Sequence, residues 1–203
     1  MTLHSVPTVP RITGVILAGG LGTRMGGVDK GLQLFAGQPL VSQITKRFAP
    51  QVDQLLINAN RNGAEYARLG YPLISDRISD FAGPLAGLQA ALSTTENEWV
   101  ATVPCDSPRL PLDLVSRLYS ALIVGNAKLA FATAGGRLHP VFCLCHISLL
   151  PELTAYLNGG GRKVTQWCNA MKAITVDFSD QTDAFSNLNT IEELLKTNAF
   201  QIT

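Results

Sequence analysis

The sequence predicts a three-layer α/β/α fold with a mostly parallel central sheet, formed by a single domain of this 203-residue chain. Up to residue 122, short apolar runs alternate with helical segments, which is the pattern of βαβ units. Trp99–Val103 is apolar throughout, as expected of a central strand buried on both faces. Later, the apolar runs Leu129–Ala132 and Val141–Leu144 flank Gly135-Gly136, and this arrangement predicts an antiparallel pair.

The other elements follow from local signals. Helix predictions rest on apolar spacing, on Pro84 in a first turn and on a capping box, Thr190-x-x-Glu193. Helices are expected at residues 40–49, 65–69, 84–92, 112–122, 149–157 and 162–169, and again after Thr190. Further strands are expected at residues 14–17, 54–58, 73–74 and 173–176, with an alternating stretch at 32–35 that meets a turn.

Composition excludes several classes of protein. With 46% apolar and 15% charged residues, the chain is typical of globular proteins. A net charge of +1 gives no basic face for nucleic acid, and no stretch approaches the ~20 apolar residues of a membrane span. Residues 1–11 lack the apolar region of a secretory signal, so we expect a disordered tail before a domain at 12–203. We expect a cytoplasmic monomer that acts on small molecules, without nucleic-acid or membrane partners.

The four cysteines show no C-x-x-C spacing. Cys143 and Cys145 are two positions apart in an apolar run, which places both on one face of a strand. Buried free thiols are therefore favoured over a disulfide framework or a zinc site, and they suit a reducing cytoplasm.

A glycine-rich turn follows the first predicted strand. It contains Gly19, Gly20, Gly22, Gly26 and Gly27, interrupted by Arg24 and followed by Asp29-Lys30. Glycines let successive backbone N–H groups converge on an anion, while arginine and lysine supply cations suited to phosphate. The G-x-G-x-x-G and P-loop patterns both fail, because Met25 and Gly31 occupy their last positions. An ordinary glycine turn is the alternative, and the two cations favour a polyphosphate site.

The same stretch carries a family resemblance. Leu17-Ala18-Gly19-Gly20, Arg24-Met25-Gly26 and Asp29-Lys30 resemble the signature L-A-G-G-x-x-x-R-M-G-x-x-D-K of the molybdenum cofactor guanylyltransferases, the MobA family. Gly20 distinguishes the chain from cytidylyl-specific relatives, whose sequence at the corresponding place resembles L-A-A-G. The resemblance runs from Ile12 to about Leu195. It implies a Rossmann-like nucleotidyltransferase fold that uses Mg²⁺ and GTP.

Polar positions follow four predicted strands, at the sheet edge where α/β proteins bind ligands. They are the glycine loop after Leu17, Asn58, Asp76 and Asp106. Each alone is more simply a turn former or a helix cap, but four at one edge favour a site. Asp106 is the expected Mg²⁺ ligand, because Mg²⁺ uses one or two carboxylates and completes its shell from water and phosphates.

The resemblance assigns further roles by position. Its P-C-D stretch places Asp106 on magnesium, with Arg24, Lys30 and Asp106 as the catalytic residues. The implied nucleotide contacts are Leu17, Ala18, Gly19, Gly20, Gly22, Arg24, Lys30, Asn58, Asp76 and Asp106. Whether Asp76 accepts hydrogen bonds from guanine stays open. The nucleotide part would span residues 12–110 and the acceptor part residues 111–200.

A second set of residues lies in the last third. The resemblance assigns its H-P, G-R and N-x-N-T elements to the molybdopterin side, which selects His139, Arg162, Lys163, Asn187 and Asn189. From the residues alone, the histidine is more simply a strand-end side chain and the asparagines are turn formers. The basic pair is either a solvated face or a phosphate site at a helix start.

The implied reaction transfers GMP from GTP to the terminal phosphate of molybdopterin or its metal-loaded form, and releases pyrophosphate. That phosphate is largely dianionic at neutral pH, so the attack needs positioning and charge neutralisation rather than a general base. Arg24 and Lys30 would hold the triphosphate. A cytidylyl- or sugar-nucleotidyltransferase and a non-catalytic nucleotide-binding module are the alternatives. Molybdopterin-inserting proteins and acceptor molybdoenzymes are candidate partners.

Overall fold

The computed structural model describes residues 10–20, 29–35, 37–78 and 83–186. Its centre is a seven-stranded sheet with the strand order β5-β4-β1-β6-β8-β7-β9. The strands are β1 (Ile12–Leu17), β4 (Gln54–Asn58), β5 (Leu73–Ile74), β6 (Trp99–Pro104), β7 (Leu129–Ala134), β8 (Arg137–His146) and β9 (Ile174–Asp177). Only β8 runs against its neighbours, and the other pairings are parallel. The predicted mostly parallel sheet is confirmed.

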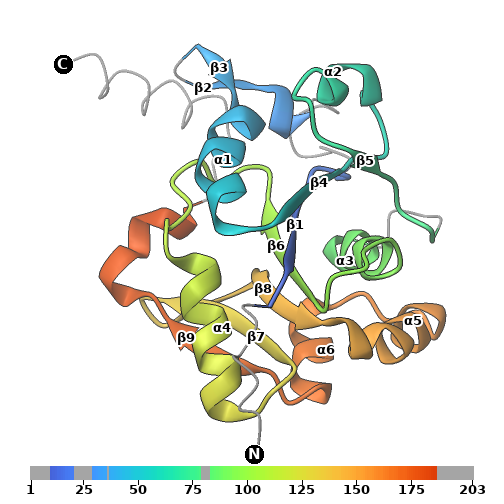
Figure 1. Ribbon diagram of the computed structural model, residues 1–203, viewed down its shortest axis with the longest axis vertical. Coiled ribbons are helices and arrows are strands. Elements are labelled where there is room, and N and C mark those ends of the chain that lie inside the picture. Colours follow the sequence, from blue (N-terminus) through green and yellow to red (C-terminus); the bar gives the residue numbers. More distant parts are fainter. Residues whose placement is uncertain (1–9, 21–28, 36, 79–82, 187–203) are drawn as a thin grey trace, which may run out of the picture.

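Helices cover both faces of the sheet (Figure 1). One face carries α1 (Leu40–Phe48), α2 (Gly63–Ala67) and α4 (Leu114–Gly125), and the other carries α3 (Pro84–Leu92), α5 (Leu150–Asn158) and α6 (Val164–Ala170). In β6, Ala101 and Val103 pack into the first core while Val100 packs into the second. Alternate side chains of a strand point to opposite faces, so the apolar run at 99–103 serves two cores. The three-layer prediction is confirmed.

The antiparallel pair predicted in the last third is also confirmed. Gly135 and Gly136 form its turn with positive φ angles of 54° and 74°, which glycine adopts at little cost. The second strand is longer than predicted at both ends, because Arg137–His139 also pair with β7 and the end of β8, up to His146, pairs with β6 along Trp99 to Thr102. It therefore lies between β6 and β7 and joins the two parts of the sheet.

Several boundaries differ from the sequence prediction. Helix α4 begins two residues later than expected, and Leu112, where the prediction placed its start, is 65% exposed. Helix α2 begins two residues earlier, directly after Asn62 in the left-handed conformation. Residues 30–32, 49–51, 147–149 and 179–185 form 3-10 turns, and β2 (Leu34–Phe35) pairs with β3 (Gln38–Pro39). The helix predicted after Thr190 and most of the predicted tail lie outside the described residues.

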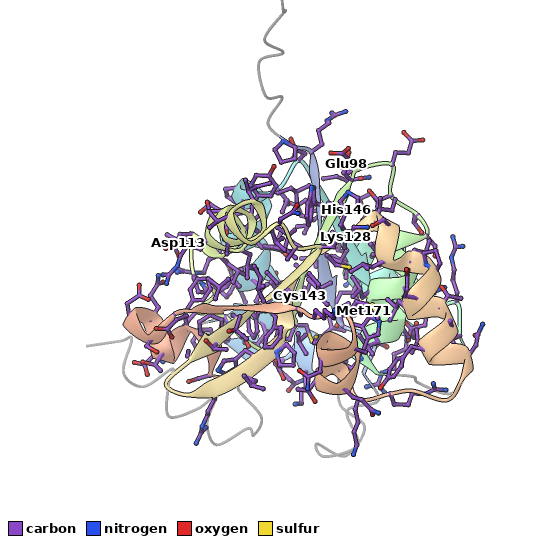
Figure 2. All side chains as sticks on the ribbon, turned by 90° about the horizontal axis from the view of Figure 1, so that it is seen from below. Glu98, Asp113, Lys128, Cys143, His146 and Met171 are labelled. Carbon is purple, nitrogen blue, oxygen red and sulfur yellow. The ribbon has the colours of Figure 1, made fainter. Side chains whose placement is uncertain are left out.

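Cys143 and Cys145 lie buried on the same face of β8, as predicted, and Cys143 sits well inside the molecule in Figure 2. Burial raises the pKa of the Cys143 thiol to about 11 and that of the buried Cys168 thiol to about 12. These side chains pack as small apolar groups. Within the described ranges, no helix is long and apolar enough to cross a bilayer.

Candidate functional site

Three parallel strands end side by side at one edge of the sheet. Leu17, the last residue of β1, pairs in register with Asn58 of β4 and with Pro104 of β6. The pairing continues into the following loops, since the Ala18 backbone N–H donates to the Asn58 carbonyl at 2.8 Å and the Cys105 N–H to the Leu17 carbonyl at 3.2 Å. The start of the glycine turn, the end of β4 and the loop after β6 are therefore fixed next to one another.

Asp106 and Lys30 meet at this edge. Lys30 Nζ lies 3.3 Å from Asp106 Oδ2, although the two residues are 76 positions apart. Asp106 is 8% exposed, and its other oxygen, Oδ1, is buried without a hydrogen-bond partner. Burial raises the pKa of the Asp106 carboxyl, and the neighbouring Lys30 ammonium opposes that rise. One carboxylate oxygen is thus paired with a cation, while the other is buried and has no protein partner.

Asn58 and Asp76 also come together. Asn58 Nδ2 donates to Asp76 Oδ1 at 2.9 Å, and Asn60 Nδ2 donates to Asp76 Oδ2 at 2.8 Å. Asn60 also accepts from the Asp76 backbone N–H at 2.9 Å and contacts the Gly19 carbonyl at 3.2 Å. The sequence prediction did not assign Asn60, yet this side chain links the glycine turn to Asp76. The three polar side chains form one fixed cluster.

Helix α3 approaches this cluster closely at Gly87. A Cβ atom there would lie 2.5 Å from Asn58 Oδ1 and 2.6 Å from Leu17 Cδ2, which is closer than atoms tolerate. Glycine therefore lets the first turns of α3 pack against the ends of β1 and β4 without displacing these two side chains.

A buried acid holds the backbone on either side of Lys30. Asp29 is 8% exposed, and its carboxylate accepts from Tyr66 Oη at 2.6 Å, Asn62 Nδ2 at 2.9 Å and the Gly31 N–H at 3.2 Å. Tyr66 is fully buried, and burial raises the pKa of its hydroxyl, which keeps it protonated as a donor. Sequence reasoning missed Asn62 and Tyr66, because a short helix gives no local signal that its side chains support a distant loop.

We expect Tyr66→Phe to lower both the stability of the protein and its kcat. The change leaves a buried carboxylate short of one donor, which costs about 1–3 kcal/mol of unfolding free energy. It also loosens the segment that carries Lys30, so kcat should fall more than the affinity for nucleotide changes. Thermal melting and steady-state kinetics measure the two effects. The control is Tyr71→Phe, since Tyr71 is half-buried outside this cluster; equal behaviour of the two variants would contradict the positioning role.

The second set of predicted residues lies apart from the first. His139 of β8 stacks on Phe185, with ring centroids 4.8 Å apart, and meets Phe142 edge-on at 6.1 Å. Burial, with a smaller effect of Arg137, lowers the pKa of the His139 imidazole, so the ring is neutral at pH 7. This histidine packs in an aromatic cluster, which agrees with the simpler interpretation from the sequence.

Arg162 and Lys163 lie between α5 and α6. Arg162 Nη1 donates at 2.8 Å to the carbonyls of Leu157 and Gly161, which closes the end of α5. Lys163 is exposed at the start of α6. A small apolar pocket connects this helix with the strand ends, and its lining includes Leu17, Thr102, Val141, Val164 and Trp167. Gly22, Arg24, Asn187 and Asn189 lie outside the described residues.

The residues from Leu17 to Gly20, which begin the glycine-rich turn, lie at the sheet edge where Lys30 pairs with the buried Asp106 carboxylate, and this arrangement agrees with a nucleotidyltransferase. Residues 14–173 match the model of the MobA-like NTP transferase domain, and the chain belongs to this family. The molybdenum cofactor guanylyltransferase of Cupriavidus pinatubonensis is 50% identical over 188 residues, which cover 90% of this chain and 94% of that protein. The enzyme of the same name from Pasteurella multocida is 48% identical over 180 residues, with 89% and 95% coverage. The family resemblance drawn from the glycine loop is confirmed.

Solved structures share the fold. The molybdopterin-guanine dinucleotide biosynthesis protein A of Archaeoglobus fulgidus superposes with a TM-score of 0.76 at 18% identity, covering 94% of this chain and 98% of its own. The 4-diphosphocytidyl-2C-methyl-D-erythritol synthase of Anaerococcus prevotii gives a TM-score of 0.71 at 11% identity, with 96% and 99% coverage. Proteins named for different functions thus share this scaffold, and the choice of nucleotide depends on the site.

Proposed function

We propose that this protein transfers GMP from GTP to the terminal phosphate of the molybdenum–molybdopterin cofactor, forms the guanine dinucleotide cofactor and releases pyrophosphate. The observation that carries the proposal is the Lys30–Asp106 pair at the shared ends of β1 and β6. It occurs in a chain half identical to a protein named molybdenum cofactor guanylyltransferase. In the reaction, an oxygen of the acceptor phosphate bonds to the α-phosphorus of GTP, and the bond from that phosphorus to the β-phosphate oxygen breaks.

The residues present fit a magnesium ion. Asp106 Oδ1 is buried without a hydrogen-bond partner, and such atoms in native proteins are completed by a ligand, an ion or water. Mg²⁺ is commonly held by one or two carboxylates together with substrate phosphates and water, so Asp106 is the residue that would hold it. Bound there, Mg²⁺ would supply charge neutralisation on the phosphate oxygens.

The residues of the chain divide the remaining work. The segment from Leu17 to Gly20 brings backbone close to the nucleotide, and the cluster of Asn58 and Asp76 faces the same edge. Lys30 neutralises phosphate charge as the bond to the leaving pyrophosphate breaks. Gly22 and Arg24 keep the nucleotide-binding roles that the family signature implies. The side chains thus position the substrates and neutralise the charge of their phosphate groups. None is needed as a general base, because the acceptor phosphate is already dianionic.

The acceptor side of the proposal uses the last third of the chain. His139, Arg162 and Lys163 stay candidates for molybdopterin contacts, together with Asn187 and Asn189. The apolar pocket beside α6 is next to two of these residues in the chain, since Pro140 and Val164 line it together with Leu17 at the nucleotide edge. We therefore propose a nucleotide part at residues 12–110 and an acceptor part at residues 111–200. Free cysteines suit a reducing cytoplasm, where the proposed monomer would meet molybdopterin-inserting proteins and molybdoenzymes.

The test is pyrophosphate release with molybdopterin as acceptor and GTP, CTP or ATP in turn, with and without Mg²⁺. We expect release with GTP only, and only when Mg²⁺ is present. Release with CTP, or with a sugar phosphate as acceptor, would replace the proposal by a cytidylyl- or sugar-nucleotidyltransferase. Tight GTP binding without release would indicate a non-catalytic module.

A further inference from the structure

Arg61 follows the end of β4, directly after Asn60, and none of the assignments above uses it. Its Nε and Nη2 atoms are buried, and they have no hydrogen-bond partner. These two atoms form one edge of the planar guanidinium group, which stays charged and can only donate. Leaving such donors unpaired inside a protein is costly, and more so for a charged group than for a neutral one.

The chain on both sides of Arg61 is held in place by the site itself. Asn60 binds the Gly19 carbonyl and Asp76, and the side chain of Asn62 binds Asp29. Arg61 therefore lies between the glycine turn and the acid that supports Lys30. Its charge acts on Tyr66, where it opposes the rise in the pKa of the hydroxyl.

The carboxylate in this neighbourhood is already used. Asp29 accepts from Tyr66, Asn62 and Gly31, and no hydrogen bond joins it to Arg61. Arginines with a structural role in this protein do find acceptors. Arg117 binds both oxygens of Asp180, and Arg47 Nε donates to the Leu110 carbonyl at 2.6 Å. Arg61 differs from both, because two of its nitrogens are buried without an acceptor beside the sheet edge that carries Asn60 and Asp29.

We propose that Arg61 is a further phosphate-binding residue of this site, whose Nε and Nη2 donate together to two oxygens of one phosphate group. Paired donation of this kind is the strongest mode of binding between arginine and phosphate, and it matches the edge that the structure leaves unpaired. The assignment rests on the proposed function for the identity of its ligands. The phosphate belongs either to the triphosphate of GTP or to the acceptor, and both present the same oxygens.

The experiment compares the full-length protein with Arg61→Met, which removes every donor but keeps an apolar side chain. Arg68→Met is the control, because Arg68 lies exposed just after α2 and carries the same charge. Calorimetric titration with inorganic pyrophosphate and with GTP measures affinity. We expect Arg61→Met to weaken binding about 10- to 100-fold, the loss that follows from removing a charge-assisted hydrogen bond, and Arg68→Met to stay within about twofold.

Thermal melting separates ligand binding from a role in folding. Without ligand, Arg61→Met should melt at or above the temperature of the wild-type protein, because the variant removes an unpaired buried charge. Added pyrophosphate should raise the melting temperature of Arg61→Met less than it raises that of the wild-type protein. A second variant, Arg61→Lys, keeps the charge but not the paired edge, and we expect an intermediate affinity. A lower ligand-free melting temperature of Arg61→Met, combined with wild-type affinity, would overturn the proposal.

Kinetics identify the source of the phosphate. A raised KM for GTP in Arg61→Met assigns the contact to the triphosphate, and a raised KM for molybdopterin alone assigns it to the acceptor; either result supports the proposal. Unchanged affinity for pyrophosphate and GTP, with unchanged KM for both substrates, would refute it. If the wild-type protein binds pyrophosphate through Arg61 but releases none from any nucleotide, only the proposed function fails.

Discussion

Asp106→Asn should lower kcat for pyrophosphate release by about 10²- to 10³-fold, a loss typical of removing a central electrostatic contact to a reacting group. Asparagine keeps the size of the side chain but replaces the charged carboxylate, including the buried Oδ1 that has no protein partner, with a neutral amide. The measurement is turnover at saturating GTP across a magnesium titration. The variant should need far more Mg²⁺ than the wild-type protein, and unchanged magnesium dependence would remove Asp106 as the ligand.

The pH dependence of stability shows whether the same substitution acts on the intended group. Burial raises the pKa of the Asp106 carboxyl, so the folded protein holds this proton more tightly than the unfolded chain. The contribution of this group to unfolding free energy is therefore present at low pH and lost as pH rises through the raised pKa. Asp106→Asn should lack this component in urea titrations at several pH values. Asp183→Asn, at an exposed position, is the control, and this variant should keep the pH-dependent contribution of Asp106 to the free energy of unfolding.

The position of the site residues at one edge of the sheet could be predicted, because it depends only on the local sequence of each strand. Leu17, Asn58 and Asp106 each follow an apolar run, and parallel strands bring their carboxyl ends together. The place of β8 could not be predicted in this way. Its pairing with β7 follows from a two-glycine turn, whereas its pairing with β6 joins Val100 to Cys145 across a distant part of the chain. Nothing in the local pattern of either strand selects that partner.

The side chains that support the site were equally hidden. Asn62 and Tyr66 reach Asp29 from 33 and 37 positions away, and the sequence shows them only as parts of a loop and a short helix. Arg61 could be noticed only after its surroundings were known, because exposed and buried arginines look alike in a sequence. Motifs thus identify groups that contact a ligand, while the groups that orient them depend on tertiary packing.

Lys30→Met should lower kcat by about 10²-fold or more at saturating GTP, since in the proposed reaction the contact of Lys30 would strengthen as charge develops on the leaving pyrophosphate. GTP binding, measured separately by titration, should weaken much less than kcat falls. Lys46→Met is the matched control, because Lys46 lies exposed on α1 and contacts Gln38 there. Wild-type turnover of Lys30→Met under saturating GTP would show that the role given to Lys30 is wrong.

We also expect Lys30→Met to shift the pH dependence of kcat. This shift distinguishes a lysine that pairs with Asp106 from one that only binds phosphate. Lys30 is the main influence that lowers the pKa of Asp106 against the effect of burial. Without it, the Asp106 carboxyl holds its proton to higher pH, and the acid limb of the kcat profile should move upward. Lys30→Arg keeps the positive charge and should leave that limb near its wild-type position, even if its larger head group slows the reaction. A lysine that only binds phosphate would give no such difference between the two variants, so the pH profile tests the pairing seen at the strand ends.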